Sequence, residues 1–185
     1  MLHPDRNLFR LRQIDDLFGG RIQTLASNAF NIAAATKDAD LLVGSVLIPG
    51  ALTPKLVTEA MVKTMKPGSA IVDVAIDQGG CIEPTAKHGA TYHDKPTFKY
   101  PVNGGEVVCY SVGNMPGAVA RTSTFTLTNA TMPYMVDLAN KGWKKACQDD
   151  KALARGINTY DGKVYFKGVS DALGYELHCT CDILK

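Results

Sequence analysis

The sequence predicts an α/β fold in which helices alternate with the strands of a parallel sheet. Two apolar runs, at residues 39–50 and 68–77, are each followed or ended by a turn that contains glycine. Apolar runs bounded by turn residues are typical of strands buried on both faces of a parallel sheet. Between them, residues 53–66 carry apolar side chains at helical spacing. A strand, a helix and a second strand form a βαβ unit, whose strands are parallel in nearly all cases.

A further strand and helix precede this unit. Residues 21–27 are predicted to form a short strand ending at Ser27 and Asn28, which are both favourable helix N-caps. Residues 29–38 then carry apolar side chains at helical spacing. The long apolar strand follows directly, and we expect it to stop at Pro49-Gly50.

The helix between the two apolar strands has start and stop signals. Thr53 is predicted to be its N-cap, with Pro54 at the first helical position. Lys63 and Lys66 would complement the dipole of its last turn, and Pro67-Gly68 would end it. Its buried stripe is predicted to consist of five apolar residues: Leu56, Val57, Ala60, Met61 and Met65.

The second half of the chain has weaker patterns. Residues 78–105 show no regular periodicity, and a loop of that length inside a domain is usually functional or mobile. Residues 106–112 predict another strand, and a helix capped by Ser123 or Thr124 should follow, kinked or split at Pro133. From residue 147 onward we expect a short helix, a hairpin around Asp161-Gly162, and a tail.

Composition excludes several classes of protein. The chain has 185 residues, of which 45% are hydrophobic, enough for one domain with a proper core. Its net charge of +2 gives no electrostatic footprint for nucleic acid. It has neither an apolar run long enough to span a bilayer nor a signal-peptide core, so we expect no membrane partner and a cytoplasmic location. The five cysteines lack zinc-finger spacing, so we expect them to be reduced and structural or incidental, with no metal site.

The carboxyl ends of the predicted strands are where a ligand should bind. In open parallel sheets, ligands occupy the crevice beyond these ends. Small or polar residues follow each predicted strand there, at Ser27-Asn28, at Pro49-Gly50, from Asp77 to Gly80 and at Gly113-Asn114. Taken singly, each has a purely structural alternative as a turn or a cap, but their convergence favours a binding crevice. Asp73, within the apolar strand, is expected to be a structural carboxylate with satisfied hydrogen bonds.

Several catalytic motifs are absent from the sequence. No G-x-G-x-x-G pyrophosphate loop occurs, and neither do H-E-x-x-H, G-x-S-x-G or a P-loop. His88 and His93 fall in the predicted long loop, where a solvated side chain is the default expectation. General motif matching therefore does not identify a reaction.

Longer segments resemble a known family. They are "RLRQIDDLFGGRI", "ADLLVGSVLIPGALTPKLVTEAMVKTMKPGSAIVDVAIDQGGCIE", "NMPGAVARTSTFTLTNATMPY" and "LANKGW". Together they resemble alanine dehydrogenase, whose wider family includes the related domain of nicotinamide nucleotide transhydrogenase, and the resemblance runs from about Asp5 to about Gly174. It implies a partial Rossmann-like, doubly wound parallel sheet with C-terminal helices. Residues 1–142 would be a partial NAD-binding domain, and residues 143–185 a segment that packs back on the substrate domain.

The resemblance also implies a function and a set of site residues. It implies NAD-dependent oxidative deamination of L-alanine to pyruvate and ammonia, which is reversible, in a homo-oligomer. Asp77 is similar to the family's catalytic aspartate. The cofactor contacts implied for this chain are Asp5 at the adenosine ribose, Ser27 beside the adenine, Val46, Leu47 and Leu56 in the apolar wall, Ile76 and Asp77 facing the nicotinamide and its ribose, and Asn114 and Met115 at the nicotinamide end.

The sequence departs from the family pattern in two ways. In the family, a strand and the glycine loop precede the position of Asp5, whereas only residues 1–4 precede it in this sequence. The substrate domain is missing from this sequence as well. The segment after Gly80 is several residues longer than is usual, and Lys87 is a possible stand-in for an arginine of the family loop. Three hypotheses follow: the cofactor-binding portion of an alanine dehydrogenase, half of a split enzyme completed by a separate chain, or an inactive nucleotide-binding or assembly module.

Overall fold

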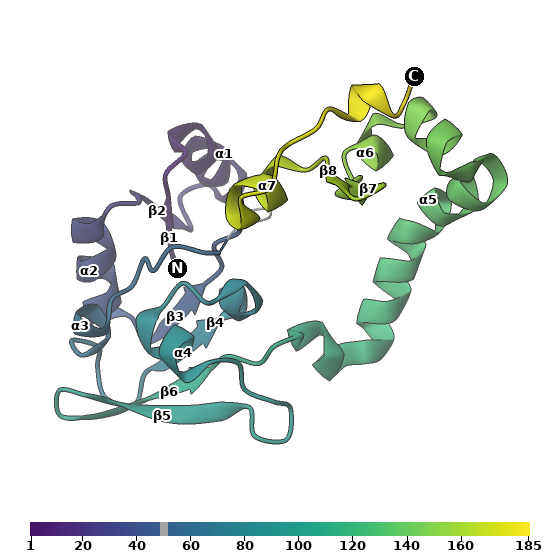
Figure 1. The fold of residues 1–185 in the computed structure, drawn as a ribbon. Helices are drawn as coiled ribbons and strands as arrows, with labels where there is room; N and C mark the ends of the chain where they lie inside the picture. Colours follow the sequence, from purple (N-terminus) through teal and green to yellow (C-terminus); the bar gives the residue numbers. More distant parts are fainter. Residues whose placement is uncertain (49–51) are drawn as a thin grey trace. The chain divides into compact units, whose positions relative to one another are not determined.

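The computed structural model describes residues 1–48 and 52–185, which form two compact units (Figure 1). The first unit comprises Met1–Leu47 and Leu52–Gly113. The second comprises Asn114–Lys185 together with Ile48. The predicted strand stop at Pro49-Gly50 lies outside the described residues. The predicted division at residue 142 concerns the arrangement in a complete protein and stays a prediction.

The first unit begins with two parallel strands and a helix between them. Strand β1 (Leu2–Asp5) pairs in parallel with β2 (Gln23–Ala26). Helix α1 (Leu8–Phe18) connects them; it begins where the Asn7 side chain accepts hydrogen bonds from the Phe9 and Arg10 N–H groups. The strand expected at residues 21–27 is thus confirmed as β2, whereas β1 and α1 were not predicted.

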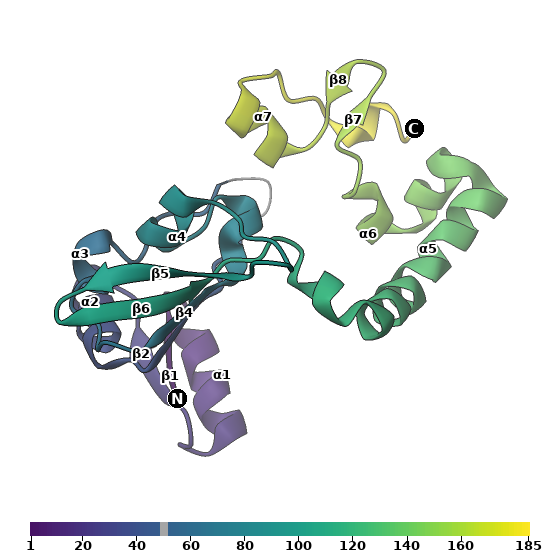
Figure 2. The ribbon, with the colours of Figure 1, turned by 90° about the horizontal axis from the view of Figure 1, so that it is seen from below.

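A four-stranded sheet forms the centre of the first unit. Its strand order is β3-β4-β6-β5, with β3 (Leu41–Gly44), β4 (Ala70–Asp73) and β6 (Gly105–Tyr110) parallel. Strand β5 (Thr97–Val102) pairs antiparallel to β6 at the edge, and Figure 2 shows the two lying side by side. The predicted α/β fold with a mainly parallel sheet is confirmed. The antiparallel edge strand was not expected.

The elements between β3 and β4 differ from the prediction. Helix α2 (Ala29–Asp38) is confirmed, but β3 ends at Gly44 rather than near residue 50. The helix expected over residues 53–66 is shortened to α3 (Glu59–Val62), which Thr58 caps. Residues 53–57 instead run alongside residues 78–82, with the Leu56 N–H donating to the Cys81 carbonyl at 2.9 Å.

The chain after β4 is also more regular than predicted. The apolar strand ends at Asp73, and residues 74–78 form a 3-10 helix, η1 (Val74–Gln78). The expected loop at residues 78–105 contains helix α4 (Glu83–His88) and all of β5, so this prediction is wrong. His88, expected in a solvated loop, ends α4, where its exposed ring stacks on Phe98 with a centroid distance of 3.7 Å.

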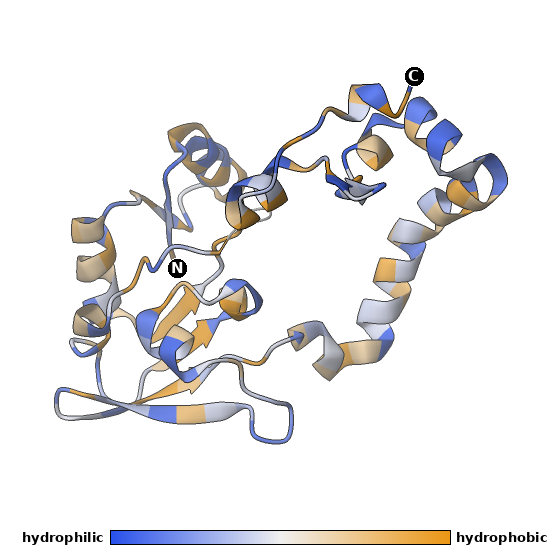
Figure 3. Ribbon diagram, in the orientation of Figure 1, coloured by the Kyte–Doolittle hydropathy of each residue, from blue (hydrophilic) through white to orange (hydrophobic). Residues whose placement is uncertain are grey.

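The hydrophobic core of the first unit lies between the central sheet, α2, α3 and the segment that follows η1. Figure 3 shows β3 and β4 coloured as apolar over most of their length. Met65, Ile71 and Ile82 are its largest fully buried side chains. The other members of the core are Ile32, Val57, Val62, Ala75, Cys81, Val107 and Cys109. This packing fixes the position of η1 because Ala75 within it belongs to the core.

The second unit is helical with one small hairpin. It comprises η2 (Met115–Val119), α5 (Ala120–Asp149), α6 (Lys151–Ala154), β7 (Thr159–Tyr160), β8 (Lys163–Val164), α7 (Lys167–Leu173) and η3 (Thr180–Asp182). The predicted C-terminal helices and hairpin are confirmed. At the hairpin turn, Asp161 and Gly162 have φ values of 47° and 70°, as a type I′ turn requires.

Two further details of the second unit correct the prediction. Helix α5 begins directly after η2 without a side-chain cap, so neither Ser123 nor Thr124 is its N-cap. It continues through Pro133, and its backbone is non-helical instead at Gly142, where φ is 72°.

Two findings bear on the expected class of protein. Cys179 and Cys181 are joined by a disulfide, so the expectation of five reduced cysteines is wrong for this pair. Of the helices in the described part of the chain, none is long and apolar enough to cross a membrane.

Candidate functional site

The carboxyl ends of the three parallel central strands lie at one edge of the sheet. The last residues of β3 and β4, Gly44 and Asp73, are partners in the register, and β6 reaches the same edge beside β4. Helix η1 follows β4 at this edge, so Asp77 stands just beyond the strand ends. This is the place where open parallel sheets bind their ligands.

Asp77 is exposed and faces a glycine. Its Oδ1 atom lies 3.1 Å from the point that a Cβ atom on Gly113 would occupy. An alanine at this position would therefore crowd the carboxylate. The structure places Asp77 within the short helix η1, which follows β4, rather than on the strand itself.

Asp73 has the opposite environment, because it is fully buried. Its Oδ2 atom accepts hydrogen bonds from the Thr85 hydroxyl at 2.5 Å, the Cys81 N–H at 3.1 Å and the Ile82 N–H at 3.2 Å. Its Oδ1 atom accepts from the Ala75 N–H at 3.2 Å, which caps η1. These bonds satisfy the buried charge, and the predicted structural role of Asp73 is confirmed.

The two glycines after η1 are explained by their backbone and by Asp73. Gly79 and Gly80 have φ values of 89° and 72°, in the region that favours glycine. A Cβ atom on Gly80 would lie only 2.8 Å from Asp73 Oδ2. The turn therefore needs glycine in order to wrap around the buried carboxylate.

Two residues that the sequence analysis placed in a helix contact this turn instead. The Lys55 ammonium group donates to the carbonyl oxygens of Gly79 and Gly80, each at 2.6 Å. The Thr53 hydroxyl donates to the Gly80 carbonyl at 2.8 Å. Sequence spacing gave no signal for these contacts because they join residues 24 to 27 positions apart.

Asp5 and Ser27 lie together at the carboxyl ends of β1 and β2. The Ser27 N–H donates to the Asp5 carbonyl at 2.9 Å. The Asp5 carboxylate accepts from the Asn7 N–H at 2.8 Å and lies 4.0 Å from His3 Nε2. Both Asp5 and Ser27 are half-buried.

The apolar residues proposed for the cofactor wall differ in exposure. Val46 and Leu56 are half-buried and pack against the core. Leu47 is 68% exposed. Ile76 is buried within η1.

Asn114 and Met115 belong to the second unit. Asn114 is exposed and has a left-handed backbone with φ of 56°, immediately before η2. Met115 is half-buried and is the first residue of η2. Their proposed contacts with a nicotinamide stay a prediction.

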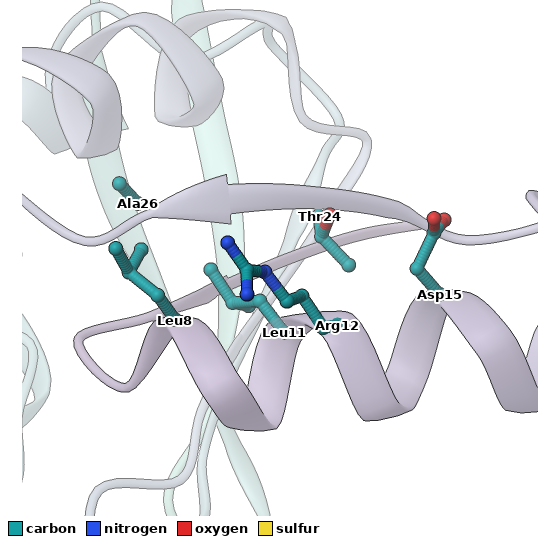
Figure 4. Close-up of a pocket in the computed structure, with 6 residues that line it drawn as sticks. All are labelled: Leu8, Leu11, Arg12, Asp15, Thr24 and Ala26. Atoms are coloured by element: carbon teal, nitrogen blue, oxygen red, sulfur yellow. The ribbon is translucent and has the colours of Figure 1, made fainter.

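Two surface grooves are lined by other residues. One, of about 320 Å³, is lined by residues of α1 and β2, shown in Figure 4: Leu8, Leu11, Arg12, Asp15, Thr24 and Ala26. The other, of about 430 Å³, is lined mainly by apolar residues of α2 and α3. Neither groove contains a predicted site residue.

The buried thiols lack the character of nucleophiles. Burial raises the pKa of Cys81 to about 11, and the nearby Asp73 charge adds to this effect. Burial alone raises the pKa of Cys109 to about 11. Both thiols are therefore protonated at neutral pH. No group of three or more potential metal-ligating side chains occurs within residues 1–48 and 52–185.

Comparisons with known proteins agree with the resemblance in the sequence. Residues 2–167 match the family described as "Alanine dehydrogenase/PNT, C-terminal domain". Alanine dehydrogenase from Bilophila wadsworthia (strain 3_1_6) is 99% identical over 181 residues, which make up 98% of this chain and 48% of that protein. Alanine dehydrogenase from Bacillus subtilis (strain 168) is 59% identical over 172 residues, or 93% of this chain and 44% of that protein.

A solved structure gives the same result. An L-alanine dehydrogenase superposes with a TM-score of 0.77 at 43% sequence identity, covering 100% of this chain and 47% of that chain. The chain thus spans about half the length of the curated relatives it matches. By sequence and by fold, it belongs to the alanine dehydrogenase/nicotinamide nucleotide transhydrogenase family, of which it contains the C-terminal domain.

Proposed function

We propose that this chain is the cofactor-binding part of an NAD-dependent L-alanine dehydrogenase, which interconverts L-alanine with pyruvate and ammonia. The observation that carries the proposal is the 99% identity over 181 residues with a protein named alanine dehydrogenase. So few substitutions make a change of cofactor or of reaction within the matched half improbable.

The adenosine end of the cofactor would be held at the ends of β1 and β2. An ionised carboxylate has about four acceptor positions, and Asp5 uses one of them for the Asn7 N–H. The remaining positions suit the two hydroxyl groups of a ribose, which is the usual role of an acid at such a strand end. Ser27 would lie beside the adenine, with Val46, Leu47 and Leu56 forming an apolar wall.

The reacting end would be held beyond β4. A bound nicotinamide would supply the hydride acceptor for the α-carbon of alanine. Ile76 and Asp77 would face its ring and ribose, and Asn114 and Met115 are proposed as further contacts of the nicotinamide end. The exposed Asp77 carboxylate would move a proton at the iminopyruvate step, in which water adds to the imine and ammonia leaves.

The remaining partners follow from the share of the enzyme that the chain covers. Residues that bind the alanine carboxylate would come from the other half of the enzyme, either on the same polypeptide or on a separate chain. We propose a homo-oligomeric assembly in the cytoplasm. Because the chain spans about half of its relatives, a second proposal is that it binds nucleotide alone without catalysis, as half of a split enzyme or as an assembly module.

Titration of the isolated chain with NADH tests these proposals. We expect saturable binding in the micromolar range, measured by calorimetry, with no alanine-dependent change in NADH absorbance. Asp5→Ala should weaken binding roughly tenfold or more, because it removes hydrogen bonds to a charged acceptor. Asp16→Ala, at an exposed aspartate on α1, is the matched control and should bind as the parent chain does.

Two outcomes would contradict the proposals. Absence of NADH binding by a folded chain would remove the assignment of the cofactor site to this half. Measurable alanine-dependent turnover by the isolated chain would show that it needs no other half.

A further inference from the structure

We propose that Lys55 is a positioning residue for Asp77. Lys55 holds the carboxyl end of η1, the short helix that contains Asp77. The inference deepens the proposed function and rests on it, because it concerns the geometry of the proposed catalytic carboxylate. It follows from contacts between residues 24 and 25 positions apart in the chain.

Helix η1 has few hydrogen bonds of its own. It spans only Val74–Gln78, and its exit is closed by two backbone bonds, from the Gly79 N–H to the Ile76 carbonyl and from the Gly80 N–H to the Ala75 carbonyl, each 2.9 Å. A single turn of this length is marginal by itself. The position of Asp77 therefore depends on groups outside the helix.

Buried Asp73 holds the amino end. Its carboxylate accepts from the Ala75 N–H at the start of η1 and from the Cys81 N–H and Ile82 N–H after it. The same side chain thus fixes both the entry and the exit of the segment. Asp73 is fully buried, so its contribution cannot be separated from stability by substitution.

Lys55 lies at the protein surface and holds the carboxyl end of η1. Its ammonium group donates to the Gly79 and Gly80 carbonyls at 2.6 Å. Backbone carbonyls at the end of a helix lack partners within it and favour a cation. Lys55 is exposed, so its removal should loosen the turn without opening the core.

Loss of the Lys55 contacts should affect the catalytic rate more than the binding of substrate or cofactor. A shift of about 1 Å in a catalytic group can reduce the rate by roughly 10²-fold. Asp77 is two residues before Gly79, so movement of that turn reaches the carboxylate directly. Substrate and cofactor contacts outside η1, such as the one proposed for Asp5, would be unchanged.

Lys55→Met and Lys66→Met form a matched pair for the test. Lys66 is also exposed and also donates to a backbone carbonyl, that of Asp38 at 2.9 Å, and it contacts Asp40 at 3.1 Å. These contacts lie just before β3, at the sheet edge opposite η1. Each substitution therefore removes an exposed ammonium group that donates to a backbone carbonyl, at a different place, and Lys66→Met also removes the ion pair with Asp40.

The first measurement is hydrogen exchange of the isolated chain, without cofactor. We expect Lys55→Met to speed exchange of the amides of residues 79–81 roughly tenfold, and Lys66→Met to leave them unchanged. Lys55→Arg, which keeps the charge and donors, should restore most of the protection. Equal exchange in the Lys55→Met and parent chains would overturn the inference.

The second measurement uses a chimeric enzyme, defined as the Bilophila wadsworthia alanine dehydrogenase with this chain's residues at the 181 matched positions. We expect Lys55→Met to lower kcat at least about tenfold with little change in the KM for NAD or alanine. Lys66→Met should match the parent. Faster exchange with unchanged kcat would overturn the positioning role. An inactive parent chimera would instead refute the proposed function, and with it any role of Lys55 in this reaction.

Discussion

Two aspartates four residues apart differ in environment, because the Asp73 side chain is buried and the Asp77 side chain is exposed. Asp73 ends β4 and is fully buried, with backbone N–H groups and a threonine hydroxyl around its carboxylate. Asp77, one turn of η1 later, is exposed at the crevice. The buried carboxylate organises the turn, and the exposed one is the carboxylate proposed to take part in proton transfer.

Removal of the Asp73 carboxylate should destabilise the chain strongly. Asp73→Ala leaves three buried N–H groups and the Thr85 hydroxyl without this acceptor. We expect the free energy of unfolding to fall by about 3 kcal/mol or more, measured by urea denaturation. The exposed control Asp16→Ala should change it by less than about 0.5 kcal/mol. A similar, small loss for both variants would show that the buried network contributes little.

The glycine that wraps around Asp73 makes a second prediction at this scale. Gly80→Ala adds a Cβ atom 2.8 Å from Asp73 Oδ2 at a positive φ, whereas Gly19→Ala adds one at a positive φ in open space. Backbone strain costs of order 1 kcal/mol at both positions, so Gly80→Ala should lower the thermal midpoint more. Equal shifts in calorimetry would mean that the carboxylate moves aside freely.

At the scale of elements, a cluster of charges joins α3, α4 and β5. Glu59 on α3 contacts Lys87 on α4 at 2.5 Å and Lys63 at 3.1 Å. Hydrogen bonds from Lys87, Tyr100 and Lys63 lower the pKa of the Glu59 carboxyl from 4.5 to about 2. Lys87, considered from the sequence as a stand-in for a loop arginine, is thus ion-paired to Glu59.

This cluster predicts a specific pH dependence of stability. A carboxyl whose pKa is lower in the folded state contributes stability above its unfolded pKa and loses it as pH falls through the folded pKa. The contribution of Glu59 should therefore be complete above about pH 4.5 and lost towards pH 2. We expect the difference in thermal midpoint between the parent and Glu59→Gln chains to shrink over this range. A difference that stays constant from pH 7 to pH 2 would contradict the assignment.

The elements also show how far local sequence patterns reach. Apolar runs located β4 and β6, and the Asp161-Gly162 pair located the small hairpin, because these signals depend on near neighbours. Thr53 and Pro54 looked like the start of a helix, but the Thr53 hydroxyl and N–H instead bind residues 78 and 80. Strand β5 was hidden because it contains Pro101 and lies at an edge, where proline is tolerated.

The candidate site was predictable in part for the same reason. Asp77 could be inferred from its place after an apolar strand. Ser27 could be inferred in the same way, from its place after a predicted strand. Asp5 was found only through the family resemblance, because β1 has no distinct pattern in four residues. Lys55 could not be found from the sequence, because its partners are the carbonyls of a turn 24 residues away.

At the scale of the whole molecule, the parallel strands of the first unit fall into two sheets. Within residues 1–48 and 52–185, β1 pairs with β2 alone and β3 pairs with β4 alone. Strands β1, β2 and β3 therefore each have one edge without a strand partner in the described structure. Such edges expose backbone groups that can pair with another chain.

We expect the isolated chain to self-associate for this reason. Sedimentation velocity over a micromolar concentration series should show a weight-average mass that rises above 19.9 kDa. Addition of NADH should not abolish the association, because the edges are not part of the proposed cofactor site. A clean monomer at every concentration would contradict the prediction.

The measurement that tests the proposed function most directly is turnover by the chimeric enzyme that carries this chain in place of the matched half. We predict alanine-dependent NADH formation close to that of the unaltered Bilophila wadsworthia enzyme. Asp77→Asn should lower kcat by roughly 10²–10⁴-fold, the usual contribution of a general acid–base group, with a much smaller effect on NADH binding. A folded chimera without activity, or full activity in the Asp77→Asn variant, would contradict the proposal.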